Sequence, residues 1–214
     1  MVISLKSSRF REISPPPASQ IGPRWTGSLG VALTRCQLEP PSYVVATYMY
    51  QTPGNGRDCR LPAVVVPVAL DAGGVVMRVF DPTRHRLAGE QPADRRWRRI
   101  EAPLLEFGSE LTLDLLEPQP GPDGLIAPPQ LQAAGGILLV DDLGRQAIAS
   151  RQLFDRLAPL AQRGLVTVRA GSERRVTLPF TSTLVFATSL VPEQILSDFQ
   201  LRHIPLRLPL SRGE

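Results

Sequence analysis

The strongest chemical signal in the sequence is a pair of adjacent carboxylates after a short aliphatic run. Asp141 and Asp142 directly follow Ile137–Val140. The run is apolar on both faces, which predicts a buried strand of a parallel sheet, and such sheets bind ligands at the carboxyl ends of their strands. One carboxylate there can hold Mg²⁺ through water, and the other can orient or deprotonate an attacking water. Two solvated turn residues at a strand end are the alternative interpretation.

Two further polar groups follow later in the chain. Residues 184–188 predict a second buried strand, which ends at Ser189, so that this hydroxyl can contact the same water. Residues 192–203 predict a helix that contains Arg202 in its last turn. Each has an ordinary alternative, since serine is common at strand ends and an arginine near a helix C-terminus interacts favourably with the dipole. The carboxylate pair, Ser189 and Arg202, occurring in this order along the chain, are a more specific signal of function than any one of them alone.

The elements that must position these groups alternate between strands and helices. Ser150–Arg163 predicts an amphipathic helix ended by Gly164, and a short helix is expected over residues 130–134. The remaining predicted strands are 64–70 and 75–80 as a hairpin, 165–169 and 174–178 as a second hairpin, and 204–210 at the end. Residues 81–102 are expected to be a polar connection and 118–129 a loop. Buried strands alternating with helices predict a parallel α/β sheet.

The chain changes character near residue 60. Residues 1–60 are rich in Pro, Ser and Arg, and the first 40 are expected to be loop or disordered, with one strand within 43–50. Residues 61–214 carry the regular patterns. We therefore divide the chain into an atypical N-terminal segment, 1–60, and a core, 61–214.

Charge and composition exclude several classes of protein. The net charge is +4, but the first 60 residues hold seven basic and three acidic groups, which leaves 17 of each in the core. We therefore expect no nucleic-acid partner.

The longest apolar run, 61–70, is too short to span a membrane, no secretory signal is evident, and only Cys36 and Cys59 are present. These features predict a cytoplasmic protein. His85 and His203 join no triad motif and are expected at the surface or at a helix end.

Residues 66–208 resemble a group of bacterial AAA+ ATPases. The matching stretches are 66–70, 77–86, 108–113, 127–146 with Ala-Pro-Pro-Gln-Leu-Gln-Ala-Ala-Gly-Gly-Ile-Leu-Leu-Val-Asp-Asp-Leu-Gly-Arg-Gln, 186–190 with Phe-Ala-Thr-Ser-Leu, and 198–204 with Asp-Phe-Gln-Leu-Arg-His-Ile. The resemblance implies a partial three-layer α/β/α P-loop NTPase core with a mainly parallel sheet and β-hairpin insertions. It implies ATP and Mg²⁺ as ligands, and a ring assembly that remodels an unidentified protein. It suggests Asp141 for Mg²⁺, Asp142 for the water, Ser189 as sensor and Arg202 as the finger that reaches a neighbour.

The sequence departs from this family at the phosphate-binding loop. The only candidate loop is 50–58, whose nucleotide-binding residues would be Gly54, Asn55, Gly56, Arg57 and Asp58. Arg57 stands where a P-loop has lysine and Asp58 where it has Ser or Thr, so a simple turn is the alternative. Ser189 replaces the family's asparagine, and the helical lid is expected to be missing because the chain ends at Glu214. A shifted reading frame over residues 1–60, rejoining near Val64, would also account for their composition.

The sequence therefore predicts an ATPase-like protein that binds ATP, with Mg-dependent hydrolysis in a ring, through an altered P-loop. The first alternative is an inactive pseudo-ATPase, or an interaction subunit that joins a ring of intact relatives and contributes Arg202. The second is nucleic-acid binding through the arginine-rich stretch from Arg84 to Arg99 around Trp97. A solvated loop balanced by Asp94 and Glu101 is the interpretation preferred for that stretch.

Overall fold

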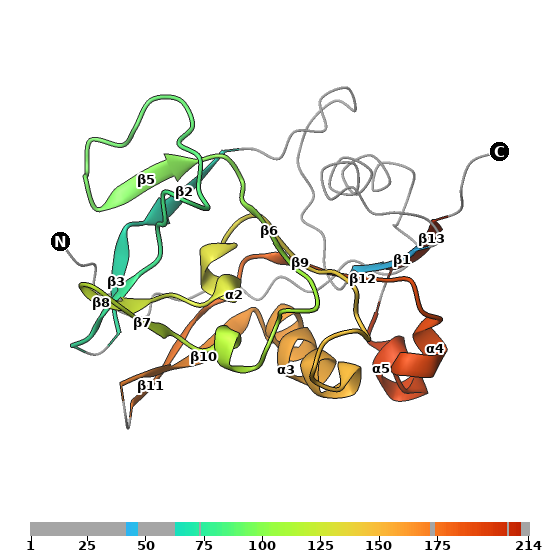
Figure 1. Ribbon diagram of the computed structural model, residues 1–214. Coiled ribbons are helices and arrows are strands. Elements are labelled where there is room, and N and C mark those ends of the chain that lie inside the picture. The colour runs from blue at the N-terminus through green and yellow to red at the C-terminus, as the bar shows by residue number, and fades with distance from the viewer. Residues whose placement is uncertain (1–41, 47–62, 73, 172–173, 205, 211–214) are drawn as a thin grey trace.

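The computed structural model describes residues 42–46, 63–72, 74–171, 174–204 and 206–210 (Figure 1). The predicted loop residues Gly54 to Asp58 lie outside this part of the chain. The strands are β1 (Ser42–Ala46), β2 (Val64–Pro67), β3 (Ala69–Asp71), β4 (Val76–Arg78), β5 (Trp97–Ile100), β6 (Leu104–Phe107), β7 (Gln119–Gly121), β8 (Gly124–Ile126), β9 (Ile137–Val140), β10 (Leu165–Ala170), β11 (Arg174–Pro179), β12 (Thr183–Thr188) and β13 (Leu206–Leu210). The helices are η2 (Asp114–Leu116), α2 (Pro129–Gln132), α3 (Ser150–Arg163), α4 (Pro192–Ile195) and α5 (Asp198–Arg202).

The largest sheet has the strand order β13-β1-β12-β9-β6. Its strand β9 is parallel to β6 on one side and to β12 on the other, with Leu138 in register with Leu105 and Leu184. Every residue of β9 and of β12 is buried, as expected of strands that are apolar on both faces. The prediction of buried parallel strands at these two places is confirmed.

The expected P-loop core is wrong, because the direction of β1 does not fit it. β1 runs antiparallel to β12 and to β13, and Tyr43 pairs with Thr188 while Ala46 pairs with Val185. The carboxyl end of β1 therefore lies at the opposite edge of the sheet from the carboxyl ends of β9 and β12. In a P-loop core the strand before the phosphate-binding loop must end at the same edge as the Mg²⁺ carboxylate, so that the loop and the carboxylate share one nucleotide.

The other sheets also depart from a three-layer α/β/α arrangement. A four-stranded sheet, β3-β4-β8-β7, is mixed, and the pairs β2-β5 and β10-β11 are antiparallel. β5 lies within the expected polar connection, and β7-β8 lies within the expected loop. The sequence analysis did not predict β5, β7 or β8, because these strands are short. The turn residues within 118–129 predicted a loop, whereas they form the tight turn of the β7-β8 hairpin, at Gly121 and Gly124. The β10-β11 hairpin was predicted correctly. Of the expected hairpin of strands 64–70 and 75–80, the structure forms only β3-β4, while residues 64–67 are the separate strand β2 that pairs with β5.

Helix α3 supplies the main packing against the large sheet. It has the predicted bounds and ends at Gly164, whose φ of 65° is the left-handed conformation that glycine adopts readily. Leu153 and Leu157 are fully buried, and the rings of Phe154 and Phe186 lie 5.4 Å apart, which joins α3 to β12. Figure 1 shows α3, α4 and α5 together on one side of this sheet.

The predicted helix over residues 192–203 is two helices. Ser197 interrupts it, because its side chain caps α5 by accepting a hydrogen bond from the Gln200 backbone N–H, at 3.3 Å. The Gln200 side chain bonds back to the Ser197 backbone N–H, which completes a capping box. In the part of the chain that the structure describes, no helix is long and apolar enough to cross a membrane.

Candidate functional site

The parallel arrangement of β6, β9 and β12 brings their carboxyl ends to one edge of the sheet. Gly108 follows β6, Asp141 follows β9, and Ser189 follows β12. Backbone hydrogen bonds continue past the strands, from the Asp141 N–H to the Phe107 carbonyl and from the Leu143 N–H to the Ala187 carbonyl, both at 2.8 Å. The sequence-predicted residues Asp141, Asp142 and Ser189 therefore lie on adjoining loops at a single edge, which we call the carboxyl edge.

A buried glutamine fixes the loops of the carboxyl edge. The side chain of Gln146 belongs to a residue only 8% exposed. Its amide nitrogen donates to the Asp141 carbonyl at 2.7 Å and to the Gly108 carbonyl at 3.3 Å, and its oxygen accepts from the Gly144 N–H at 3.0 Å. One side chain thus satisfies backbone groups of the loop after β6 and of the loop after β9, which the strand ladder can no longer reach.

Thr188 joins the loop after β9 to the loop after β12. Its buried hydroxyl donates to the Leu143 carbonyl at 2.6 Å and accepts from the Leu190 N–H at 3.0 Å. Gly144 lies in this crowded region with a φ of 106°, and a Cβ there would stand 2.7 Å from the Leu190 side chain. A residue without a side chain is therefore required where the two loops approach each other.

Arg145 connects Asp142 to Ser189. Its guanidinium lies 3.7 Å from a carboxylate oxygen of Asp142 and donates to the Ser189 hydroxyl at 3.2 Å. Asp142 has a φ of 51°, the one positive φ among the described residues other than glycine, and its N–H donates to the Asp141 carboxylate at 2.8 Å. The edge therefore presents two carboxylates, a hydroxyl and an exposed cation together.

Burial, together with nearby negative charge, raises the pKa of two carboxyl groups at this edge. Burial, followed by the charges of Asp142 and Glu110, raises the pKa of Asp141, although the bond from the Asp142 N–H opposes this. Burial, with the charges of Asp141 and Glu110, also raises the pKa of Glu106. Negative charge is therefore crowded here, and a bound cation would relieve it.

Asp141 and Asp142 are the residues of this edge whose oxygens suit a magnesium ion. Among the described residues, no group of three or more His, Cys, Asp or Glu side chains is arranged to hold a metal. Mg²⁺ commonly takes one or two carboxylates and completes its shell with water and substrate phosphates. Asp141, with its raised pKa, and Asp142 meet that requirement.

Arg202 lies apart from these groups. It is exposed in the last turn of α5 and makes no ion pair with any residue that the structure describes. An arginine that serves a neighbouring subunit must be exposed in this way.

Several arginines of the stretch from Arg84 to Arg99 are engaged within the fold. Arg96 forms a bidentate pair with Asp94, and Arg98 donates to the carbonyls of Arg95 and Trp97. The guanidinium of Arg84 lies 5.4 Å from the centre of the Phe107 ring. These contacts favour the interpretation of this stretch as part of the fold rather than as a nucleic-acid surface.

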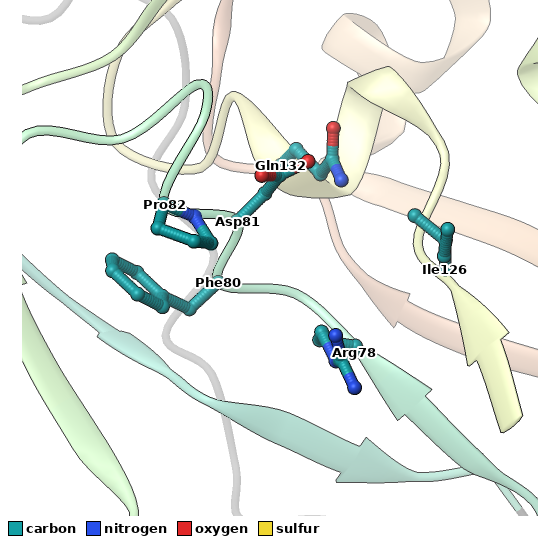
Figure 2. Close-up of a pocket in the computed structure, with 6 residues that line it drawn as sticks. All are labelled: Arg78, Phe80, Asp81, Pro82, Ile126 and Gln132. Atoms are coloured by element: carbon teal, nitrogen blue, oxygen red, sulfur yellow. The ribbon is translucent and has the colours of Figure 1, made fainter. Parts of the chain in front are cut away.

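A small pocket lies beside α2 (Figure 2). Its volume is about 80 Å³, well below the roughly 300 Å³ at which ligand pockets begin. It is lined by Arg78, Phe80, Asp81, Pro82, Ile126 and Gln132. We conclude that this pocket is too small for a nucleotide.

The expected surface position of His85 is wrong. The residue is 4% exposed, its Nδ1 accepts from the Asp81 N–H at 3.0 Å, and its Nε2 lies 2.9 Å from the Gln132 carbonyl. Burial is the main cause that lowers the pKa of His85, and its two bonds require a neutral ring. It is a structural residue that joins the chain after β4 to α2. His203 lies exposed at the end of α5, as predicted.

Comparison with protein-family models gives no match, and no curated protein matches the chain either. The resemblance to AAA+ ATPases therefore rests on the sequence stretches themselves, and the function must be argued from the carboxyl edge.

Sequence reasoning missed Gln146, Arg145, Glu106 and Glu110. Arg145 and Gln146 lie within the stretch that most resembles the family, but nothing in the sequence shows that they bond to Ser189 and to Gly108. Glu106 and Glu110 were missed because the sequence of residues 104–116 predicts a structured stretch but does not show whether it is helix or strand. The available signal for a functional residue was the charged side chain of Glu106 within an otherwise apolar run.

We predict that Gln146→Met destabilises the protein by about 1–3 kcal/mol, because it keeps the volume but leaves two partly buried carbonyls and one N–H without their partner. Chemical denaturation measures the effect. Gln152→Met, at an exposed position of α3, is the matched control and is expected to change stability by less than about 0.5 kcal/mol. Equal effects of the two substitutions would contradict the role given to Gln146.

We predict that Asp141→Asn raises the melting temperature at pH 7. The folded protein raises the pKa of this carboxyl, so its ionisation disfavours folding, and stability is lost as the pH rises from 3.8 through the raised value. The advantage of the variant should therefore vanish below about pH 3.8, where Asp141 is protonated in both states. Asp114→Asn, at an exposed residue, is the control; a lower melting temperature for Asp141→Asn at pH 7 would contradict the argument.

Proposed function

We propose that the chain binds ATP together with Mg²⁺ at the carboxyl edge of β6, β9 and β12, as a protein similar in activity to AAA+ ATPases. The observation that supports this most strongly is the juxtaposition of Asp141, Asp142 and Ser189 at the ends of neighbouring parallel strands, with Arg145 between them. A bound nucleoside triphosphate needs a divalent cation, oxygen ligands for that cation and a positive group near the phosphates. The carboxyl edge offers the oxygen ligands and the positive group.

Asp141 would hold the Mg²⁺ ion through water, and Asp142 would orient the attacking water. Bound Mg²⁺ would neutralise charge on the phosphates. The raised pKa of Asp141 is an energetic reason for it to accept a cation. Gln146 acts as a positioning residue, because it holds the Asp141 backbone through the carbonyl at 2.7 Å.

Arg145 and Ser189 would contact the phosphates or the water. The ion pair between Arg145 and Asp142 is 3.7 Å long and both side chains are about half exposed. Such a pair contributes little to stability, so the guanidinium can turn from Asp142 to a phosphate at little cost. That exchange would free the Asp142 carboxylate at the moment when phosphate is bound.

We further propose assembly with other copies or with intact AAA+ relatives, in which Arg202 of one chain approaches the nucleotide of the next. The exposure of Arg202 and its lack of an ion pair with described residues support this. The remodelled partner would be a protein. A cytoplasmic location agrees with ATP as the ligand and with only two cysteines in the chain.

The second candidate is binding without hydrolysis, as a pseudo-ATPase or an interaction subunit. The direction of β1 favours it, because the strand before residues 50–58 ends at the opposite edge from Asp141. Arg57 and Asp58, in place of lysine and a hydroxyl residue, point the same way.

We predict saturable, Mg-dependent binding of a fluorescent ATP analogue, measured by fluorescence titration of the purified chain. Asp141→Asn should weaken binding in the presence of Mg²⁺ by about tenfold or more, and without Mg²⁺ it should bind at least as well as the parent, since one repulsive charge has been removed. Asp114→Asn is again the control and should change neither value.

Phosphate release separates the two candidates. If Asp142→Asn abolishes release while binding stays within about twofold of the parent, the ATPase candidate is supported. Binding without any release supports the pseudo-ATPase. A folded chain that does not bind the analogue, with or without Mg²⁺, would rule out both.

A further inference from the structure

The β10-β11 hairpin has one buried face and one exposed face. Burial alternates strictly along β10, where Val166 and Val168 are at most 1% exposed while their neighbours face solvent. The register places three pairs on the exposed face, namely Leu165 with Pro179, Thr167 with Thr177, and Arg169 with Arg175. We call these six residues the outer hairpin face.

The pair of arginines on this face is unfavourable for the fold. Like charges directly opposite each other on antiparallel strands destabilise the pairing. Neither Arg169 nor Arg175 forms an ion pair with a residue that the structure describes. By contrast, Arg96 is paired with Asp94 and Arg156 with Glu117. The two hairpin arginines are thus available to an external anion, which would remove their mutual repulsion.

The hairpin holds this charge in a defined place. Glu117 accepts from the Arg156 guanidinium at 2.7 Å and from the Arg169 backbone N–H at 3.3 Å, which ties β10 to α3. The Thr167 and Thr177 hydroxyls lie 3.0 Å apart beside the arginines. Leu165, next along the face, is 47% exposed. The face therefore passes from two guanidiniums, through two hydroxyls, to an apolar surface.

We infer that the outer hairpin face binds single-stranded nucleic acid. Arg169 and Arg175 would take a backbone phosphate, which guanidinium groups recognise with two parallel hydrogen bonds, and the threonine hydroxyls would contact the sugar-phosphate chain. The unpaired bases of a single strand can then lie against Leu165 and Pro179, at the apolar end of the face. This inference does not depend on ATP binding at the carboxyl edge.

Fluorescence anisotropy with a labelled oligo(dT) of about 20 nucleotides tests the inference on the full chain. Arg175→Glu should weaken binding by about tenfold or more at low salt, and it should reduce the salt slope by about 0.7 for each phosphate that the variant no longer neutralises. The same substitution places opposite charges across the hairpin, so the melting temperature should not fall. Arg151→Glu, an equal charge change at an exposed residue of α3, is the matched control and should cost less than about threefold.

A double Arg169→Gln, Arg175→Gln variant repeats the test if Arg175→Glu lowers the melting temperature. No binding by the parent chain at low salt would overturn the inference. Equal losses of affinity in Arg175→Glu and Arg151→Glu would also overturn it, because the binding would then follow net charge alone. Displacement of the oligonucleotide by polyglutamate as effectively as by unlabelled oligo(dT) would assign the face to acidic proteins and contradict a nucleic-acid site.

Discussion

The carboxyl edge depends on the hydrogen bonds of one buried amide. Where parallel strands end, their backbone groups lose the sheet ladder and must find other partners or water. Gln146 supplies those partners to Gly108, Asp141 and Gly144 at once. The loops after β6 and β9 are held together in this way, and burial, with the charge of Glu110 nearby, raises the pKa of Asp141 and of Glu106. The electrostatic character of the site is therefore a consequence of packing.

The direction of the strands limits what this edge can do. β6, β9 and β12 place their carboxyl ends together, and β1 alone opposes its neighbours. The carboxylates that we propose for Mg²⁺ therefore lie together, whereas the strand that precedes residues 50–58 ends at the other edge. A protein of this shape must draw phosphate contacts from groups already at the edge, of which Arg145 is the nearest to Asp142 and Ser189.

Local patterns in the sequence predicted single elements well and their assembly poorly. The four aliphatic residues of β9, the periodicity of α3 and the turn of the β10-β11 hairpin are local signals, and each element formed where it was expected. The direction of β1 is set by pairing with β12 and β13, which are far away in the sequence. No local pattern contains that information, and the expected parallel core was therefore wrong.

The candidate site shows the same difference between local signals, which the sequence contains, and long-range contacts, which it does not. Adjacent residues such as Asp141 and Asp142 could be found from the sequence because a strand-end pair is a local signal. The link from Arg145 to Ser189 spans 44 positions, and the link from Gln146 to Gly108 spans 38, so both depended on the fold. The capping box of Ser197 and Gln200 was readable in principle from the spacing of a serine and a glutamine three residues later, but residues 192–203 were predicted as one helix.

Hydrogen–deuterium exchange of the full chain, with and without Mg²⁺ and ATP, tests most directly whether the carboxyl edge is one ligand-binding unit. The account predicts slower exchange on adding both ligands in peptides covering 108–111, 141–146 and 188–190 together, and no change with ATP alone. Protection confined to other parts of the chain, or protection of only one of these three loops, would contradict it.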